Sequence, residues 1–150
     1  MVKKLKQRLI ENKLLIGWRE WCALPALNIN EIKAKIDTGA RTSALHAFDI
    51  EAFRKRGKEH VRFSVHPHQR DDKTVIHCEA KVIDQRYVTS SNGHKEERYV
   101  IATQLCLGKA CWDIELTLSN RDPLRFRMLL GREAFKHHAL IDPSRSYLQS

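Results

Sequence analysis

Long apolar runs are absent from this 150-residue sequence. A membrane-spanning helix needs about 20 consecutive apolar residues, and no stretch approaches that length. The basic start, residues 2–8, is followed by apolar residues only at 9–10 and 14–16, with three polar residues between these two pieces. That pattern is too interrupted for the apolar segment of a signal peptide. We therefore expect a cytoplasmic protein that makes no membrane contact.

Sequence signatures of disulfide, metal and nucleotide chemistry are also absent. The cysteines include no C-x-x-C pair and no zinc-finger spacing, so we predict that they are reduced and mostly buried. They are Cys22, Cys78, Cys106 and Cys111. No H-E-x-x-H motif and no Walker-type glycine-rich loop occurs in the chain, which argues against a zinc-peptidase helix and against direct use of ATP. We expect no cofactor.

The sequence has few acidic residues relative to basic ones, with 18 Asp and Glu and 27 Lys and Arg. The net charge of +9 favours acidic partners, namely nucleic acid, anionic lipid or an acidic polypeptide, and does not choose among them. The basic runs at 2–13 and 54–58 are typical of solvated faces, and no aromatic residue interleaves with their charges. We therefore predict no nucleic-acid partner.

Short segments with period-two alternation, separated by turn residues, make up most of the chain. This pattern predicts an all-β barrel or sandwich with almost no helix. The predicted strands lie at 15–24, 31–36, 44–47, 61–65, 75–88, 96–107, 112–118, 126–130, 139–141 and 147–148. No linker or internal repeat is visible. We predict one domain at 16–150, preceded by a basic arm at 1–15.

Two local signals refine this prediction. A brief helix is expected after Asp49, which is placed to cap it, with Phe48 and Phe53 at the flanking staple positions and Gly57 at its end. A second helical turn is expected at 132–136. Asn-Gly at 92–93, between the two longest strand-like runs, is a strong hairpin signal.

The chain is organised around the segment at 34–43, Ala-Lys-Ile-Asp-Thr-Gly-Ala-Arg-Thr-Ser. An alternating strand there delivers Asp37 into a tight turn at Thr38 and Gly39. A carboxylate at the end of an apolar strand is costly unless it is hydrogen-bonded or takes part in chemistry. Asp-Thr-Gly is also a common sequence in surface turns. The tripeptide alone therefore does not decide between a catalytic carboxylate and a turn residue.

Residues 36–40 resemble the catalytic turn of retroviral-type aspartic peptidases, and 128–132 resembles the apolar-apolar-Gly-Arg motif that packs behind that turn. More narrowly, four segments resemble a bacterial family of retropepsin-like proteins often labelled "ATP-dependent zinc protease". These segments are 16–21, 35–46, 88–94 and 129–134. Some members of that family are associated with ATP-grasp ligases that append glutamates to a ribosomal protein. The resemblance covers about residues 16–148.

The resemblance implies a closed β-barrel with a flap hairpin, one or two short helices and an aspartic endopeptidase activity. It assigns catalysis to Asp37, Thr38 and Gly39. The residues expected to bind substrate are Ala40, Arg41, Asn92 and Gly93, and those expected to support the turn from behind are Gly131 and Arg132. Asp-Thr-Gly occurs once, so the paired carboxylates of such an enzyme require a symmetric homodimer. Arg41 and the net charge predict an acidic substrate, and the resemblance implies that it is Glu-rich.

Two alternatives remain open at this stage. The first is a zinc-dependent hydrolase on the same fold, using the densest cluster of metal-ligating residue types. This cluster comprises His66, His68, Asp71, Asp72, His77 and Cys78. His46 and His94 fall inside the family-like segments, where we expect packing or flap roles. The second alternative is a non-catalytic basic module that binds ribosomal or acidic protein partners.

Overall fold

The structure is a computed structural model that describes residues 13–68, 71, 73–89, 92–120 and 125–149. Strands dominate it, with one 3₁₀ turn at Pro25–Leu27 and one short helix, α2 (Arg132–Phe135), among the described residues. The strands are β1 (Leu14–Ile16), β2 (Arg19–Leu24), β3 (Ile29–Asp37), β4 (Ser43–His46), β5 (Phe48–Lys55), β6 (Lys58–Val65), β7 (Ile76–Thr89), β8 (Lys95–Leu107), β9 (Ala110–Ser119), β10 (Met128–Gly131) and β11 (Ala139–Ile141). The predicted all-β class with very little helix is confirmed.

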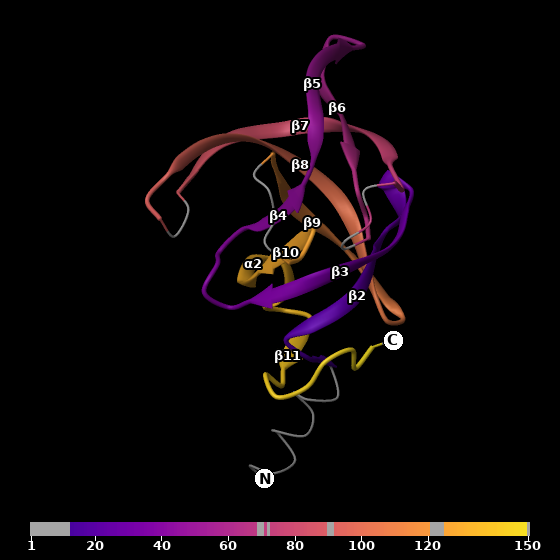
Figure 1. Ribbon diagram of the computed structural model, residues 1–150, viewed down its shortest axis with the longest axis vertical. Helices are drawn as coiled ribbons and strands as arrows, with labels where there is room; N and C mark the ends of the chain where they lie inside the picture. The colour runs from indigo at the N-terminus through magenta and orange to yellow at the C-terminus, as the bar shows by residue number, and fades with distance from the viewer. Residues whose placement is uncertain (1–12, 69–70, 72, 90–91, 121–124, 150) are drawn as a thin grey trace.

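Six strands close into a barrel in the order β2, β3, β10, β4, β9, β8 (Figure 1). The ring closes where Ala23 of β2 pairs with Cys106 of β8. Alternate side chains of these strands point inward and pack as one apolar core, which includes the fully buried Ile32, Leu105 and Leu116. The closed barrel implied by the family resemblance is confirmed.

One part of the barrel wall inserts a strand from near the end of the chain between two strands that are close to each other in sequence. β10 lies between β3 and β4, parallel to β3 and antiparallel to β4. Its register places Met128 beside Ala34 and Gly131 beside Asp37. The apolar side chains of β10 are buried, which fixes this short strand against two neighbours at once.

Outside the barrel, β5, β6 and the first half of β7 form a three-stranded extension, and the rest of β7 pairs with β8 in a long hairpin. We call this second hairpin, beyond the pair Val82 and Ile101, the flap. In Figure 1 the flap arches beyond α2, while the β5–β6 hairpin stands away from the barrel. Asn92 and Gly93 occupy the predicted turn of the flap, although its residues 90–91 lie outside the described ones.

The prediction of a helix after Asp49 is wrong, because this segment forms strand β5. Phe48 stacks on His66 and Phe53 packs on His60, so both aromatic side chains find partners outside their own segment. Gly57 does not end a helix and instead sits in the turn of the β5–β6 hairpin, at φ 75°. Cross-strand pairing with β6 therefore overrides the local capping pattern.

The closing strand predicted at 147–148 is also wrong, since these residues form no ladder. The segment is held instead by Glu20, a fully buried carboxylate on β2. It accepts hydrogen bonds from the backbone N–H groups of Leu148 at 2.9 Å, Gln149 at 3.0 Å and Gly17 at 2.7 Å. Three such bonds satisfy a buried carboxylate that would otherwise be costly.

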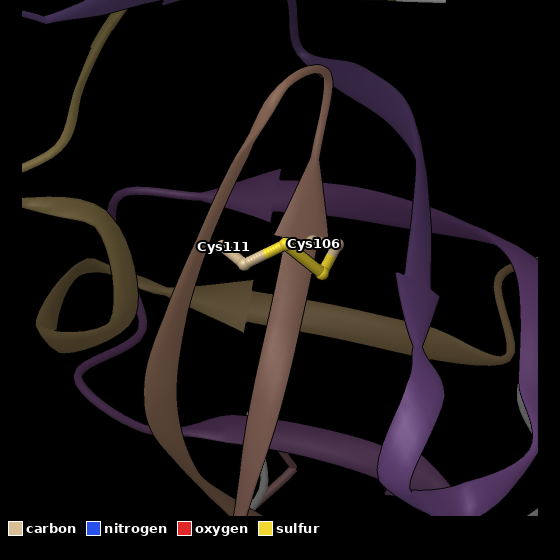
Figure 2. Close-up of a disulfide and its surroundings, with 2 residues drawn as sticks. All are labelled: Cys106 and Cys111. Carbon is tan, nitrogen blue, oxygen red and sulfur yellow. A yellow bond between two sulfur atoms is a disulfide. The ribbon is translucent and has the colours of Figure 1, made fainter.

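Two of the four cysteines depart from the prediction, since Cys106 and Cys111 form a disulfide. They face each other across the β8–β9 hairpin, on either side of its turn (Figure 2). Cys22 and Cys78 are free and buried, as predicted. Burial raises the pKa of Cys78 to about 11 and raises that of Cys22 further, so both thiols are protonated at neutral pH.

Most of the predicted basic arm, residues 1–12, lies outside the described residues. Leu14 and Leu15 belong to β1, which pairs in parallel with β11 and not with the barrel sheet. Within the described part of the chain, no helix is both long and apolar enough to cross a membrane.

Candidate active site

Asp37 is the last residue of β3, and its side chain is held by the turn that follows. The backbone N–H of Gly39 donates a hydrogen bond of 2.9 Å to Asp37 Oδ1, and the N–H of Ala40 donates to the Asp37 carbonyl at 3.3 Å. Thr38 and Gly39 are exposed, and Asp37 is half-buried. We call residues 37–40 the Asp37 turn. It presents a carboxylate of fixed orientation at the surface of the barrel.

The end of β10 and the start of α2 pack directly behind this turn. The backbone N–H of Arg132 donates to the Ala40 carbonyl at 2.8 Å, and the Arg132 guanidinium reaches the Thr38 carbonyl at 3.4 Å. A Cβ at Gly131 would lie 2.5 Å from the Thr42 carbonyl oxygen. Only glycine therefore allows β10 to approach so closely, which gives the predicted supporting pair a structural basis.

Sequence reasoning missed two hydroxyl residues that join the start of β4, just after the Asp37 turn, to β10 and β9. The Ser43 hydroxyl accepts a hydrogen bond from the Gly131 N–H at 3.0 Å, and the Thr117 hydroxyl donates to the Ser43 carbonyl at 3.0 Å. Both residues are buried. Ser43 ends the motif segment at 34–43, but nothing local marks its hydroxyl as a partner for a residue in β10.

A cleft of about 840 Å³ opens beside the turn, between it and the flap. It is lined by residues 41–43, by Ile83 and 86–89 of the flap, by Ala102 of β8, by β9 and by the start of α2. Of the four residues expected to bind substrate, Arg41 lines the cleft, whereas Ala40, Asn92 and Gly93 do not. Asp37 does not line it either. The cleft therefore begins next to the Asp37 turn and continues under the flap.

Charges of both signs line this cleft, and most of them are already paired. Arg86 of the flap contacts Asp84 at 2.7 Å and Glu115 of β9 at 3.0 Å, and these hydrogen bonds raise the pKa of Arg86. The hydrogen bond from Lys136 lowers the pKa of Glu133. Arg41 is exposed and belongs to no ion pair among the described residues. It is the cleft cation that is best placed to meet an acidic ligand.

The histidine-rich segment does not assemble into a metal centre in the part of the chain that the structure describes. His66 stacks on Phe48, and its Nδ1 lies 3.1 Å from the Thr74 carbonyl. His77 contacts the Ser64 hydroxyl at 2.9 Å, and the Cys78 thiol lies 3.4 Å from the Leu27 carbonyl. Asp72 lies outside the described residues. The described donors point to different neighbours and do not converge on one point.

A family model described as RimB-like, "Retropepsin-like aspartic endopeptidase RimB", matches residues 15–150. The chain belongs to this family. The match covers the barrel, the Asp37 turn and the flap, and it confirms the family resemblance drawn from the four sequence segments.

The chain is also similar to curated proteins that are named as ligases. A Shewanella pealeana protein named "Probable alpha-L-glutamate ligase" is 51% identical over 137 residues, and a Desulfotalea psychrophila protein of the same name is 52% identical over 132 residues. These alignments include 91% and 88% of this chain but only 30% and 28% of the relatives. The chain thus spans less than a third of the curated relatives it matches.

Among solved structures, the fold is similar to that of Lpg0085 from Legionella pneumophila, a protein titled as of unknown function. The TM-score is 0.76 at 25% sequence identity, and the match covers 91% of this chain and 98% of the Legionella chain. The similarity therefore extends over almost the whole of both molecules.

Proposed function

We propose that this protein is an aspartic endopeptidase in which Asp37 activates water for attack on a peptide bond. The observation that carries the proposal is the geometry of the Asp37 turn. One carboxylate oxygen of Asp37 accepts the Gly39 N–H, and the turn is braced from behind by β10 and α2. This brace holds a half-buried carboxylate in the turn that precedes Arg41, where the lining of a cleft large enough for a peptide begins. The family match supports the same reaction.

The mechanism requires two carboxylates that share one proton. Two like charges a few ångströms apart do not both ionise, so one group stays protonated while the other acts as a base. The base takes a proton from water, and the protonated partner polarises the scissile carbonyl. Asp37 supplies one such group per chain. A homodimer with a two-fold axis beside the Asp37 turn would bring the second copy of Asp37 opposite the first.

The proposed substrate is an acidic, Glu-rich polypeptide. Arg41 lines the cleft, follows the Asp37 turn and has no ion-pair partner among the described residues, so its guanidinium can hold a carboxylate in a bidentate fork. Several relatives are named probable alpha-L-glutamate ligases. The name is theirs and describes bond formation, but it supports a glutamate chain as the material on which this domain acts.

The experiment that tests the proposed reaction compares cleavage of Glu-rich peptides by the wild type and by Asp37→Asn. This substitution keeps the size and hydrogen-bonding capacity of the side chain and removes the charge. We expect cleavage to be lost and binding to persist. A chelator should leave cleavage unchanged, since the shared-proton mechanism uses no metal. Activity that a chelator abolishes and zinc restores would favour the zinc hydrolase instead, and binding without any cleavage would favour the non-catalytic module.

Arg41→Leu tests the substrate class separately. We expect it to weaken processing of Glu-rich peptides about tenfold, the scale of one lost charge-assisted hydrogen-bonded pair, and to leave neutral peptides nearly unaffected. The control is Arg145→Leu, which removes the same charge from an exposed position outside the cleft. If Arg41→Leu changes the rate of processing equally for acidic and neutral peptides, the acidic-substrate proposal is wrong while the proposed reaction stands.

A further inference from the structure

The outward face of the β5–β6–β7 extension carries a group of side chains that the proposed peptidase function does not use. Directly opposite residues of an antiparallel pair share one face of a sheet. The register pairs Lys55 with Lys58, Phe53 with His60 and His60 with Lys81. On the opposite face of the same strands, Val61 is fully buried against the core. The residues on the face opposite Val61 therefore point away from the barrel. We call six of them the hairpin platform: Phe53, Lys55, Lys58, His60, Arg62 and Lys81.

Flat groups occupy the middle of the platform. The rings of Phe53 and His60 lie 5.6 Å apart, and the Arg62 guanidinium carbon lies 4.1 Å from the centre of the Phe53 ring. Arg62 is exposed, so the outer side of its guanidinium faces solvent while the inner side rests on Phe53. A planar cation supported in this way offers a stacking surface for a nucleobase.

Positive charge surrounds these flat groups. Lys58 and Lys81 are exposed on either side of His60, and Arg62 and Lys55 lie nearby. Two acidic residues share this face: Glu51 lies directly opposite Arg62 on β5, and Glu79 lies opposite it on β7 and contacts Lys55 at 3.0 Å. The hydrogen bond from Lys55 and the charges of Lys55, His60 and Arg62 lower the pKa of Glu79. Lys58 and Lys81 belong to no ion pair among the described residues.

The turn at the tip adds a further cation at a conformational cost. Arg56 and Gly57 both have positive φ, 54° and 75°, as in the two-residue hairpin turns that favour Asn-Gly. An arginine in the left-handed region is less stable than asparagine there. The chain thus displays a basic side chain, fully exposed at the end of the platform, where turn geometry favours another residue.

We propose that the hairpin platform binds single-stranded nucleic acid, with a base stacked on Arg62 and phosphates held at Lys58 and Lys81. This inference goes beyond the proposed peptidase function and does not depend on it. An acidic polypeptide would match the charges equally well, and its carboxylates could bind the edge of the Arg62 guanidinium. It would leave the stacking face of Arg62 unused, because Glu and Asp side chains carry no ring system. Nucleic acid uses both features, since every base has a face that stacks and every linkage carries a charge.

Linear sequence hides this arrangement. The basic run at 54–58 contains no aromatic residue, which is why the sequence alone predicts a solvated face for it. Cross-strand register places Phe53 and His60 among the lysines of three different strand segments, so the interleaving of charge and aromatic groups exists only on the folded sheet.

The test measures binding of a fluorescently labelled oligouridylate of about 12 nucleotides by anisotropy, over a series of salt concentrations. Each phosphate contact contributes a slope of about −0.7 to the logarithm of affinity against the logarithm of salt. Lys58→Gln and Lys81→Gln should therefore each reduce the slope by about 0.7 and weaken binding at low salt. Lys109→Gln, on the turn between β8 and β9, removes the same charge away from the platform and should change the slope far less.

Arg62→Lys separates stacking from charge, because it keeps the charge and removes the plane. We expect at least about fivefold weaker binding, on the scale of one lost base stack. Arg56→Asn should weaken binding about twofold while raising the melting temperature, so the loss cannot come from misfolding.

No binding of the oligouridylate at low salt would overturn the proposal. So would variants at Lys58 and Lys81 that behave like the Lys109 control. Arg62→Lys binding as tightly as the wild type, together with displacement of the oligonucleotide by poly-L-glutamate at equal charge concentration, would assign the platform to an acidic polypeptide instead.

Discussion

The two sides of the cleft are built in different ways. On the side of the Asp37 turn, backbone groups bond to backbone groups: the Arg132 N–H to the Ala40 carbonyl and the Glu133 N–H to the Arg41 carbonyl. The contact is so close that Gly131 has no room for a Cβ. On the flap side, the link to the barrel wall includes a side-chain ion pair between Arg86 and Glu115, whose side chains are 37% and 54% exposed.

This difference suits two separate roles: the Asp37 side positions the carboxylate, and the flap side closes over the cleft. A carboxylate that takes part in chemistry must be held to a fraction of an ångström, and a network of backbone hydrogen bonds does that. A flap must open and close, and exposed ion pairs of about 0–1 kcal/mol can be exchanged for contacts with substrate at little cost. The exposed Tyr87 and Ile83 of the flap, 73% and 44% exposed, fit a surface that a ligand covers.

The same substitution on the two sides should have very different effects. Gly131→Ala places a Cβ 2.5 Å from the Thr42 carbonyl oxygen, so we expect a loss of more than about 3 kcal/mol of unfolding free energy and loss of cleavage. A Cβ at Gly93 would meet no atom within 4 Å, so Gly93→Ala should lose only about 1 kcal/mol of unfolding free energy, the cost of its positive φ. Chemical denaturation measures both. Equal effects would contradict the contrast drawn between the two sides.

Removal of one buried hydroxyl behind the Asp37 turn should have the next largest effect. Ser43→Ala leaves the Gly131 N–H without its partner in a buried site, which costs about 1–3 kcal/mol. The matched control is Ser144→Ala, whose hydroxyl contacts Asp142 in an exposed turn and should matter by less than about 0.5 kcal/mol. If both variants lose the same stability by thermal or chemical unfolding, the Ser43 bond does not brace the turn.

Breaking the flap contact should have the smallest effect on stability and a clear effect on motion. Arg86→Leu removes a half-exposed ion pair, so we expect less than about 1 kcal/mol of lost stability. Amide exchange should become faster at 84–89 and 95–98 in the flap and stay unchanged in β3 and β10. Lys55→Leu breaks the ion pair with Glu79 outside the flap and serves as control. Unchanged exchange in the flap would show that Arg86 does not hold it.

Local sequence was sufficient for the elements whose cause is local. The alternation leading to Asp37, the turn at Gly39 and the hairpin at Gly93 all have residue-level signals within a few positions, whereas the role of Gly131 came from the family resemblance. These elements position the proposed active site. The barrel itself required the family resemblance, because alternation alone predicts either a barrel or a sandwich.

What the sequence could not predict depends on distant partners. The Ser43 hydroxyl bonds to a residue 88 positions away, and the C-terminal segment is held by Glu20, 128 positions from Leu148. The helix predicted after Asp49 fails because β6 supplies a better partner than a helical turn does. The Cys106–Cys111 disulfide is different, because its two cysteines are only five positions apart, beside the short gap between the strands predicted at 96–107 and 112–118.

The central claim is that two Asp37 side chains from two chains form one active site. The most direct test measures specific activity and sedimentation across a single dilution series, and then activity after mixing wild type with excess Asp37→Asn chains. We expect activity to fall in step with dissociation of the dimer, and the inactive chains to suppress the wild type by forming mixed dimers. Full activity from a species that sediments as a monomer, with no suppression on mixing, would contradict the shared-carboxylate mechanism.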